Sequence, residues 1–226
     1  MNVLGGRMSD FVGNFINVAA TCPATRALGP GVRSIVWVQG CPLRCRGCLA
    51  PEWIPERKAR LVSPAALAAE LMVDERVTGL TISGGEPMVQ AAALAQMVRA
   101  AKAARELTVV CYSGYRLARL RGANPPPGAE SLLAELDVLI DGRYVAARND
   151  GHGLRGSSNQ RVHYLTGRLR GYDFENGSRA AELHFSDGEV QLVGVPAPGL
   201  LDALARVPEQ LSPRGGLTLA DAPREP

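Results

Sequence analysis

Residues 34–48 read Ser-Ile-Val-Trp-Val-Gln-Gly-Cys-Pro-Leu-Arg-Cys-Arg-Gly-Cys, a hydrophobic run that ends in three closely spaced cysteines. The run 34–39 has no polar alternation in its middle, which is typical of a strand buried on both faces of a parallel sheet. The loop that follows, Gly40–Cys48, holds three of the five cysteines of the chain. It therefore begins at the carboxyl end of a predicted strand, where α/β folds bind their ligands.

Cys41, Cys45 and Cys48 bring three thiols to one point, and thiolates select zinc, copper(I) or iron–sulfur clusters. Structural zinc and electron-carrier clusters are closed by four protein ligands, whereas chemistry at a metal needs an open position. There is no second C-x2-C pair to complete a zinc ribbon. An odd cysteine count and the lack of a secretory signal argue against a disulfide. A fourth ligand could come from Cys22, Cys111, His152, His163 or His184.

The C-x3-C-x2-C spacing after a hydrophobic strand resembles the signature of radical S-adenosylmethionine (SAM) enzymes. In that family three cysteines hold three irons of a 4Fe–4S cluster, and the fourth iron chelates the amino and carboxylate groups of SAM. The resemblance implies that the metal ligands here are Cys41, Cys45 and Cys48, and that the cofactors are a 4Fe–4S cluster and SAM.

Length and composition limit the number of domains and the kinds of binding partner. We expect 226 residues to form a single domain, 1–226, with its core at about 28–165 and a flexible tail at 208–226. The chain has 25 Lys+Arg against 22 Asp+Glu, a balance that gives no case for nucleic-acid or membrane-surface binding. No apolar run reaches the roughly 18 residues of a membrane span. We expect a cytoplasmic protein.

Strand–helix alternation continues along the chain. Strands are predicted at 78–82, 107–112 and 138–140, and helices at 63–71, 88–105, 116–121 and up to 136. Ser63-Pro64 predicts a helix start, with Ser as N-cap and Pro in the first turn. Together with the resemblance, this predicts an α/β fold, a partial (βα)6-type open barrel with a C-terminal β-hairpin from 182–185 and 189–193. A strand at 11–20, a loop at 21–31 and a helix at about 200–206 complete the prediction.

Gly84-Gly85-Glu86-Pro87 follows the second buried strand and resembles the G-G-E-P motif that contacts the amino group of SAM. Two glycines expose backbone at a strand end, and a carboxylate there can hold an ammonium group. The same residues could instead be an ordinary helix entry with a favourable acid at the dipole. Ser113, at the end of the third strand, is a weaker cofactor-binding candidate.

Asp141 and Arg143 end the fourth strand, where the activating enzymes of glycyl-radical proteins keep an acid and a base near SAM. A surface ion pair is the alternative. Gly29-Pro30-Gly31-Val32-Arg33 resembles the G-P-G-x-R segment of the same enzymes, although Leu28 stands where they often have aspartate. Residues 155–160, with Asn159 as a cofactor-binding candidate, resemble a segment of anaerobic ribonucleotide reductase activators. Gly47, directly before the third cysteine, is similar to these activators as well, because they also have glycine at that position.

The resemblance therefore implies a radical SAM oxidoreductase that installs a glycyl radical on a partner such as anaerobic ribonucleotide reductase. Flavodoxin or ferredoxin would be its electron donor. One alternative is a stand-alone radical SAM enzyme that modifies a small molecule or peptide. Another is a non-enzymatic module in which zinc or a closed iron–sulfur cluster only stabilises the cysteine loop.

Overall fold

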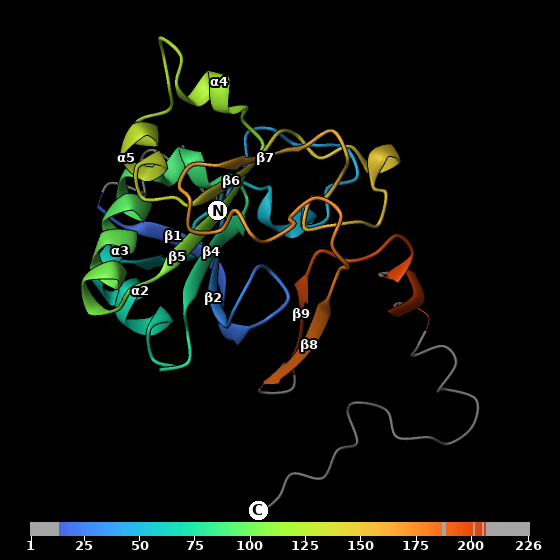
Figure 1. Ribbon diagram of the computed structural model, residues 1–226, viewed down its shortest axis with the longest axis horizontal. Helices are drawn as coiled ribbons and strands as arrows, with labels where there is room; N and C mark the ends of the chain where they lie inside the picture. Colours follow the sequence, from blue (N-terminus) through green and yellow to red (C-terminus); the bar gives the residue numbers. More distant parts are fainter. Residues whose placement is uncertain (1–13, 187–188, 201, 205, 207–226) are drawn as a thin grey trace, which may run out of the picture.

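A seven-stranded sheet runs through the protein in the strand order β3-β1-β2-β4-β5-β6-β7. The computed structural model describes residues 14–186, 189–200, 202–204 and 206 (Figure 1). The strands of the sheet are β1 (Ile16–Thr25), β2 (Arg33–Val38), β3 (Arg60–Val62), β4 (Gly79–Gly84), β5 (Thr108–Ser113), β6 (Val138–Asp141) and β7 (Arg161–Tyr164).

The centre of the sheet is parallel. β2, β4, β5 and β6 run in one direction, so their carboxyl ends share one edge. In this register Val38 lies beside Gly84, and Ser113 lies beside Asp141. The cysteine loop after β2 and the glycine motif after β4 therefore leave the sheet next to each other.

The predicted α/β fold, in which a parallel sheet stays open and does not close into a barrel, is confirmed. In the described part of the chain, antiparallel β1, β3 and β7 complete the sheet, where a six-unit partial barrel would continue with further βα repeats. The connection from β1 to β2 is only a short turn, and parallel pairing would need a long crossover. β1 therefore pairs antiparallel with β2.

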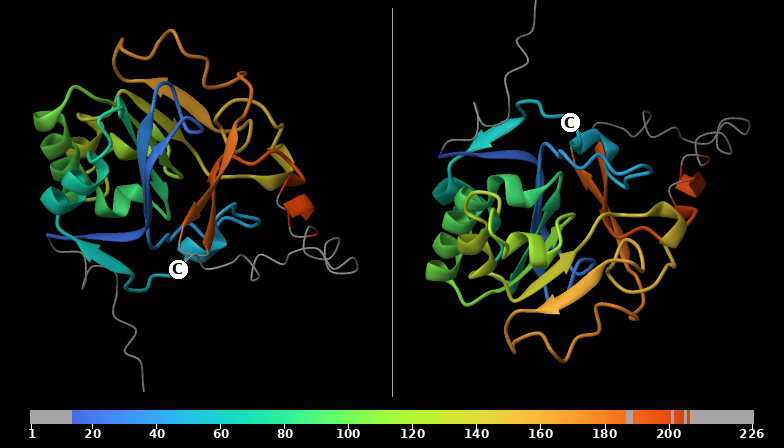
Figure 2. Two further views of the ribbon diagram at one scale, coloured as in Figure 1. Left: turned by 90° about the horizontal axis from the view of Figure 1, so that it is seen from below. Right: turned by 90° about the horizontal axis from the view of Figure 1, so that it is seen from above.

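Helices cover one face of this sheet, and Figures 1 and 2 show α2, α3 and α5 together on that face. The predicted start of α2 is confirmed, because Ser63 Oγ accepts a hydrogen bond from the Ala66 amide at 3.3 Å and Pro64 occupies the first turn. The helices are α2 (Pro64–Leu71), α3 (Ala91–Ala104), α4 (Leu117–Leu120) and α5 (Ala129–Leu133), with 3-10 turns η1 (Pro51–Trp53), η2 (Pro87–Gln90) and η3 (Ala146–Arg148).

The main core lies between the helices and the sheet. Leu67 and Leu71 of α2 and Leu94 and Met97 of α3 are buried there, as their helical spacing predicts. Every residue of β2 is buried, which agrees with a strand covered on both faces. The parallel strands are thus held in place by apolar contacts on the helical side.

A two-stranded hairpin covers the other face of the sheet (Figure 2). It consists of β8 (Ala181–Ser186) and β9 (Glu189–Gly194), with Leu183 opposite Leu192. Val193 of β9 is buried in a second core cluster with Cys22, Leu28 and Trp37. The hairpin predicted from the sequence is confirmed, and it docks onto β1 and β2.

The segment Gly29–Arg33 ends in a fully buried arginine. The Arg33 guanidinium donates to Thr81 Oγ1 at 2.7 Å and to the hydroxyl and carbonyl oxygens of Thr108, each at 3.0 Å. Burial lowers the pKa of Arg33 to about 10. This arginine ties the beginning of β2 to β4 and β5.

Some predicted boundaries were wrong. The loop predicted at 21–31 begins later, because β1 continues to Thr25 by pairing with β2 through two register shifts. β7 was not predicted, since four residues on a sheet edge give little periodicity.

Three predictions cannot be compared fully with the structure. The part of the 11–20 strand before residue 14 and the predicted tail 208–226 lie outside the described residues, and the predicted helix at 200–206 is described only in part. Among the described residues, no helix has the length and apolar character needed to cross a membrane.

Candidate functional site

The cysteine loop starts where β2 ends. Gly40 has a φ of 97°, and its amide donates to the Trp53 carbonyl at 2.8 Å. The loop then curves through Arg44 and Gly47, with φ angles of 46° and 72°. The Cys48 amide closes a turn onto the Cys45 carbonyl at 3.2 Å. These backbone contacts hold the loop across the carboxyl edge of the parallel strands.

The three loop cysteines are free and partly buried. Burial raises the pKa of the Cys41 and Cys48 thiols, so both side chains are protonated at neutral pH until a metal binds them. Across the described residues, no three His, Cys, Asp or Glu side chains converge on a single point. The fit to an iron–sulfur cluster therefore rests on the donor chemistry and on the position of the loop.

The alternative fourth ligands lie elsewhere. Cys111 is buried inside β5, as expected of a small apolar residue, and burial raises its pKa well above the ordinary value. His163 contacts Asp141 and His184 contacts Glu182, each at 2.8 Å. Neither these residues nor Cys22 and His152 line the cavity beside the loop. Cys45 and Cys48 line that cavity, and Cys41 lies in the same loop. A loop with three thiols and, among the described residues, no fourth protein ligand beside it suits a cluster with an open position.

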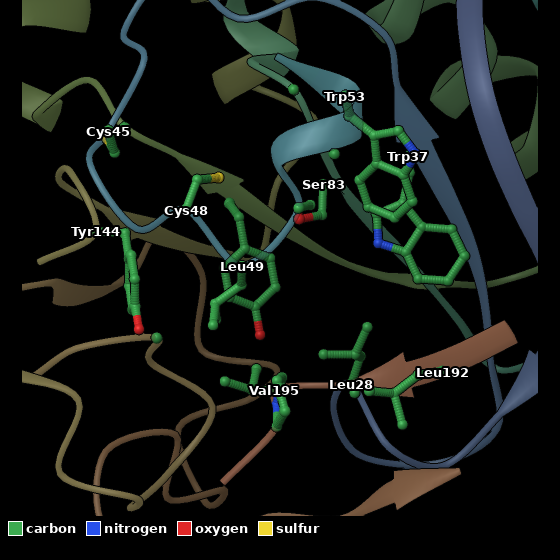
Figure 3. Close-up of a pocket in the computed structure, with 18 of the residues that line it drawn as sticks. Leu28, Trp37, Cys45, Cys48, Leu49, Trp53, Ser83, Tyr144, Leu192 and Val195 are labelled. Carbon is green, nitrogen blue, oxygen red and sulfur yellow. The ribbon is translucent and has the colours of Figure 1, made fainter. Parts of the chain in front are cut away.

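Gly84 and Gly85 form the wall beside the cysteine loop. Gly84 has a φ of 107°, and a Cβ there would lie 2.3 Å from the Val38 amide nitrogen. A Cβ on Gly85 would lie 2.2 Å from the Gly40 carbonyl oxygen. The two glycines allow β4 and the cysteine loop to touch, and both line a cavity of about 410 Å³. Figure 3 shows this cavity with Cys45, Cys48 and Ser83 on its lining. Ser113 and Gly114 line the same cavity.

Glu86 lies behind this wall. Its carboxylate, 1% exposed, accepts hydrogen bonds from the Met88 amide at 3.0 Å, Ser113 Oγ at 2.8 Å and the Gly114 amide at 2.8 Å. Burial raises the pKa of Glu86 to about 7, although the three hydrogen bonds oppose the rise. The carboxylate joins the ends of β4 and β5, and its contact with an ammonium group stays a prediction.

Asp141 is buried below the cavity. It accepts from the Leu117 amide at 2.6 Å and from Arg116 Nη1 at 3.0 Å. The alternative of a surface ion pair between Asp141 and Arg143 is not formed, because Arg116 and His163 hold the carboxylate. A contact of Asp141 and Arg143 with SAM stays a prediction. Arg143 is exposed, while its neighbours Gly142 and Tyr144 line the cavity.

Residues 27–163 match the family described as "4Fe-4S single cluster domain". The chain belongs to this family. The match runs from the turn before β2 to β7 and includes the three cysteines and Gly84–Glu86. The iron–sulfur cluster predicted from the cysteine spacing is confirmed at the level of the family.

The curated relatives that this chain matches are named as activating proteins. The anaerobic ribonucleoside-triphosphate reductase-activating protein of Vibrio cholerae is 33% identical over 147 residues, covering 61% of this chain and 91% of that protein. The protein of the same name in Escherichia coli K12 is 30% identical over 151 residues, with the same coverage. The pyruvate formate-lyase-activating enzyme of Listeria monocytogenes is 39% identical over 87 residues, covering 36% of this chain and 35% of that enzyme. The resemblance to activating proteins that the sequence indicated is confirmed.

Among solved structures, QueE from Escherichia coli has a TM-score of 0.38 at 13% identity, covering 64% of this chain and 78% of that chain. This likeness is too distant to support an argument.

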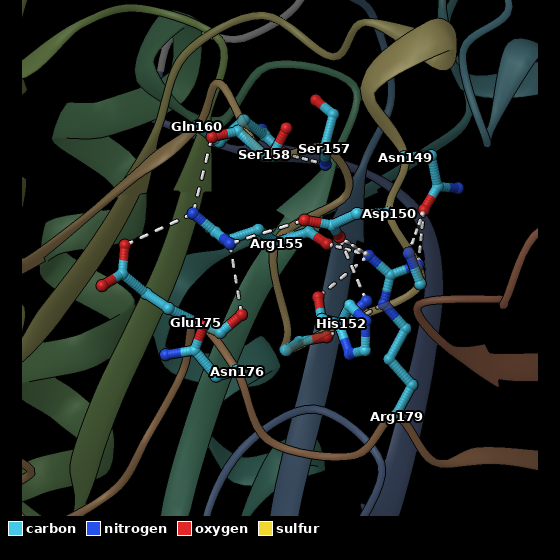
Figure 4. Close-up of polar contacts among 12 residues, drawn as sticks. Asn149, Asp150, His152, Arg155, Ser157, Ser158, Gln160, Glu175, Asn176 and Arg179 are labelled. Carbon is cyan, nitrogen blue, oxygen red and sulfur yellow. Dashed lines mark hydrogen bonds and ion pairs between the residues drawn. The ribbon is translucent and has the colours of Figure 1, made fainter.

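In this 4Fe-4S family member, the segment 155–160 is a hydrogen-bonded loop beside the cavity (Figure 4). Arg155 pairs with Glu175 at 3.4 Å and lies 3.7 Å from Asp150. Only Gly156 and Gln160 of this segment reach the cavity lining. Asn159 Nδ2 donates to the Arg143 carbonyl at 2.8 Å, and the buried Asn159 Oδ1 has no hydrogen-bond partner in the described part of the chain.

The aromatic residues that line the cavity were not predicted as site residues from the sequence. Trp37 and Trp53 stack with ring centroids 5.5 Å apart, and Tyr112 and Tyr144 also line the cavity. Strand periodicity could have identified Trp37, because Val36 and Val38 face the helices and Trp37 must face the opposite side. No signal within the cysteine segment indicates that β9 contributes as well.

Proposed function

We propose that the protein is a radical SAM activating enzyme that installs a glycyl radical on a large partner enzyme of the anaerobic ribonucleoside-triphosphate reductase type. The observation that carries the proposal is the three-cysteine loop at the carboxyl edge of β2, which touches Gly84 and Gly85 and lines a cavity with them through Cys45 and Cys48. The relatives with activating-protein names support it.

Each part of the site has a role in this proposal. Cys41, Cys45 and Cys48 hold the cluster through thiolates and leave one iron for SAM. A cluster held by these thiolates and reduced by the electron donor would supply the single electron for reductive cleavage of SAM to methionine and a 5′-deoxyadenosyl radical, which would take a hydrogen atom from a glycine of the partner. In this proposal the backbone of Gly84 and Gly85 and the Ser113 side chain, which line the cavity, bind polar groups of SAM.

Glu86 acts through its neighbours in this scheme. Its carboxylate fixes Ser113 and the Gly114 amide at the cavity wall, so it is a positioning residue for the SAM side of the cavity. Asp141, at the end of β6, holds the beginning of α4 through the Leu117 amide and is followed by Gly142, which lines the cavity.

The electron donor in this proposal is flavodoxin or ferredoxin, which carry single electrons at low potential. We also place the protein in the cytoplasm, because all five cysteines are free thiols and a reducing compartment keeps them so.

The test is anaerobic reconstitution with iron and sulfide, followed by reduction, addition of SAM and quantification of 5′-deoxyadenosine. Wild type and the Cys111→Ala control, in which the altered cysteine is buried in β5, should form the product, and Cys45→Ala should not. Addition of the partner reductase should then give a stable protein radical in electron paramagnetic resonance. A wild type that holds a full cluster complement and forms no 5′-deoxyadenosine would refute the proposal.

A further inference from the structure

The cavity has a second half that lies away from the cysteines. Figure 3 shows Leu28, Trp37, Trp53 and Leu192 on one side and Cys45, Cys48 and Tyr144 on the other. These four side chains are uncharged, although Glu52 and Gln191, the sequence neighbours of Trp53 and Leu192, also line the cavity. We call this half the tryptophan subsite, defined by Leu28, Trp37, Trp53, Leu192 and Val195.

The floor of the tryptophan subsite is firmly packed. Leu28, Trp37 and Val195 are 4%, 5% and 6% exposed and belong to one apolar cluster, against which Trp53 packs. Trp53 and Leu192 are only partly buried and form its sides. The subsite thus combines a preformed floor with side walls that a ligand can cover.

One wall comes from outside the segment that matches the family. The match ends at residue 163, and Leu192 and Val195 belong to the hairpin region that follows. Glu182 fastens this hairpin to the end of β1, because its carboxylate accepts from Thr25 Oγ1 at 2.6 Å and from the Arg26 amide at 2.8 Å. Val193 between the two wall residues is fully buried.

The base of the hairpin is fixed as well. The Arg179 side chain, 4% exposed, donates to Asn149 Oδ1 at 2.6 Å, to the Gly153 carbonyl at 3.0 Å and to the Pro196 carbonyl at 3.2 Å (Figure 4). These bonds join the start of β8, the end of β9 and the loop before residue 155. The hairpin wall is therefore preorganised, which lowers the entropy cost of binding.

Leu28 fits this arrangement. Activating enzymes often have aspartate at the corresponding place, whereas Leu28 here packs in the cluster that contains Val193 and Val195. A carboxylate in that position would be buried among aliphatic groups without a partner, at a considerable cost. Leu28 and the hairpin residues Val193 and Val195 thus pack together, and Leu28 and Val195 give this part of the cavity an apolar lining.

We propose that the tryptophan subsite binds an aliphatic or aromatic side chain of the polypeptide on which the enzyme acts, adjacent in sequence to the residue that reacts. This inference rests on the proposed function, which supplies the polypeptide substrate. The subsite and the cysteine loop share one cavity, so a chain whose reacting residue faces Cys45 and Cys48 brings a neighbouring side chain to Leu192 and Trp53. Apolar burial provides the affinity, and a charged or polar side chain is disfavoured.

Intrinsic fluorescence gives a direct test, because Trp37 and Trp53 are the only two tryptophans of the chain. The probes are two synthetic peptides, acetyl-Ala-Ala-Gly-Leu-Ala-amide and its counterpart with Ser in place of Leu. Titration of the full-length protein should give a change in emission with the Leu peptide and a Kd lower by about tenfold or more than with the Ser peptide. Trp37→Phe and Trp53→Phe assign the signal.

The matched variants lie opposite each other in the hairpin. Leu192→Gln and Leu192→Ala should remove the preference for the Leu peptide, while Leu183→Gln should keep it, because Leu183 pairs with Leu192 but is 44% exposed and lies outside the cavity lining. Thermal unfolding of each variant verifies that the hairpin variants are folded.

Two results would overturn the inference: equal affinity for both peptides, or a fluorescence change with SAM alone that competes with the Leu peptide. In the second case the adenine of SAM occupies the subsite. The proposed function is tested separately by 5′-deoxyadenosine formation in the reconstituted wild type. If 5′-deoxyadenosine forms but the Leu and Ser peptides bind equally, only the subsite is refuted. If the Leu peptide binds more tightly but no 5′-deoxyadenosine forms, only the proposed function is refuted.

Discussion

Glu86 gives the protein a pH-dependent stability that can be measured. Its carboxylate is 1% exposed at the ends of β4 and β5, and burial raises its pKa from 4.5 to about 7. One pKa unit is worth about 1.4 kcal/mol, so the difference between the folded and unfolded states corresponds to about 3 kcal/mol.

The sign follows from which state holds the proton more tightly. The folded protein keeps the proton on Glu86 at a pH where the unfolded chain has already lost it, so protonation stabilises the folded state. This contribution is complete below pH 4.5 and is lost as the pH rises through about 7. The free energy of unfolding of the iron-free protein should therefore fall by about 3 kcal/mol from Glu86 between about pH 5 and about pH 8.

The assay is urea denaturation of iron-free wild type, Glu86→Gln and Glu75→Gln at several pH values in this range. Glu75 is exposed and has the same charge, so its variant should keep the wild-type pH dependence. The difference between wild type and Glu86→Gln isolates the buried carboxylate from all other titrating groups. If Glu86→Gln keeps the wild-type slope, the three hydrogen bonds keep the carboxylate ionised and the reasoning from burial is refuted.

Three further substitutions test the cysteine loop, the buried Asp141 carboxylate and the start of α2. Gly85→Ala places a Cβ against the Gly40 carbonyl and should displace the cysteine loop, so the iron content after reconstitution should fall, whereas Gly167→Ala, with open space around its Cβ, should load normally. Asp141→Asn weakens three hydrogen bonds to a buried carboxylate and should lower the free energy of unfolding by about 2–4 kcal/mol in urea, and an unchanged value would contradict its role. Ser63→Ala removes the N-cap of α2 and should cost about 1 kcal/mol, measured by thermal denaturation.

The sequence determined the features that depend on neighbours along the chain. The apolar run before Cys41 predicted a buried parallel strand, Ser63-Pro64 predicted the start of α2, and two alternating segments predicted the hairpin. The cysteine spacing predicted the iron–sulfur family. Periodicity, capping and ligand spacing act over a few residues, so a single sequence carries them in full.

The tertiary structure decided the contacts between distant segments. The sequence alone could not identify Arg116 as the ion-pair partner of Asp141. Arg143 is nearer in the sequence, but the path of the loop after β5 brings Arg116 to the carboxylate. The sequence also could not bring Leu192 to the cavity that Leu28 and Trp37 line. The place of Leu192 is fixed by how the hairpin docks on β1 and β2, through buried apolar side chains and the hydrogen bonds of Glu182. The sequence thus specified the cluster loop, and packing across the sheet specified the rest of the cavity beside it.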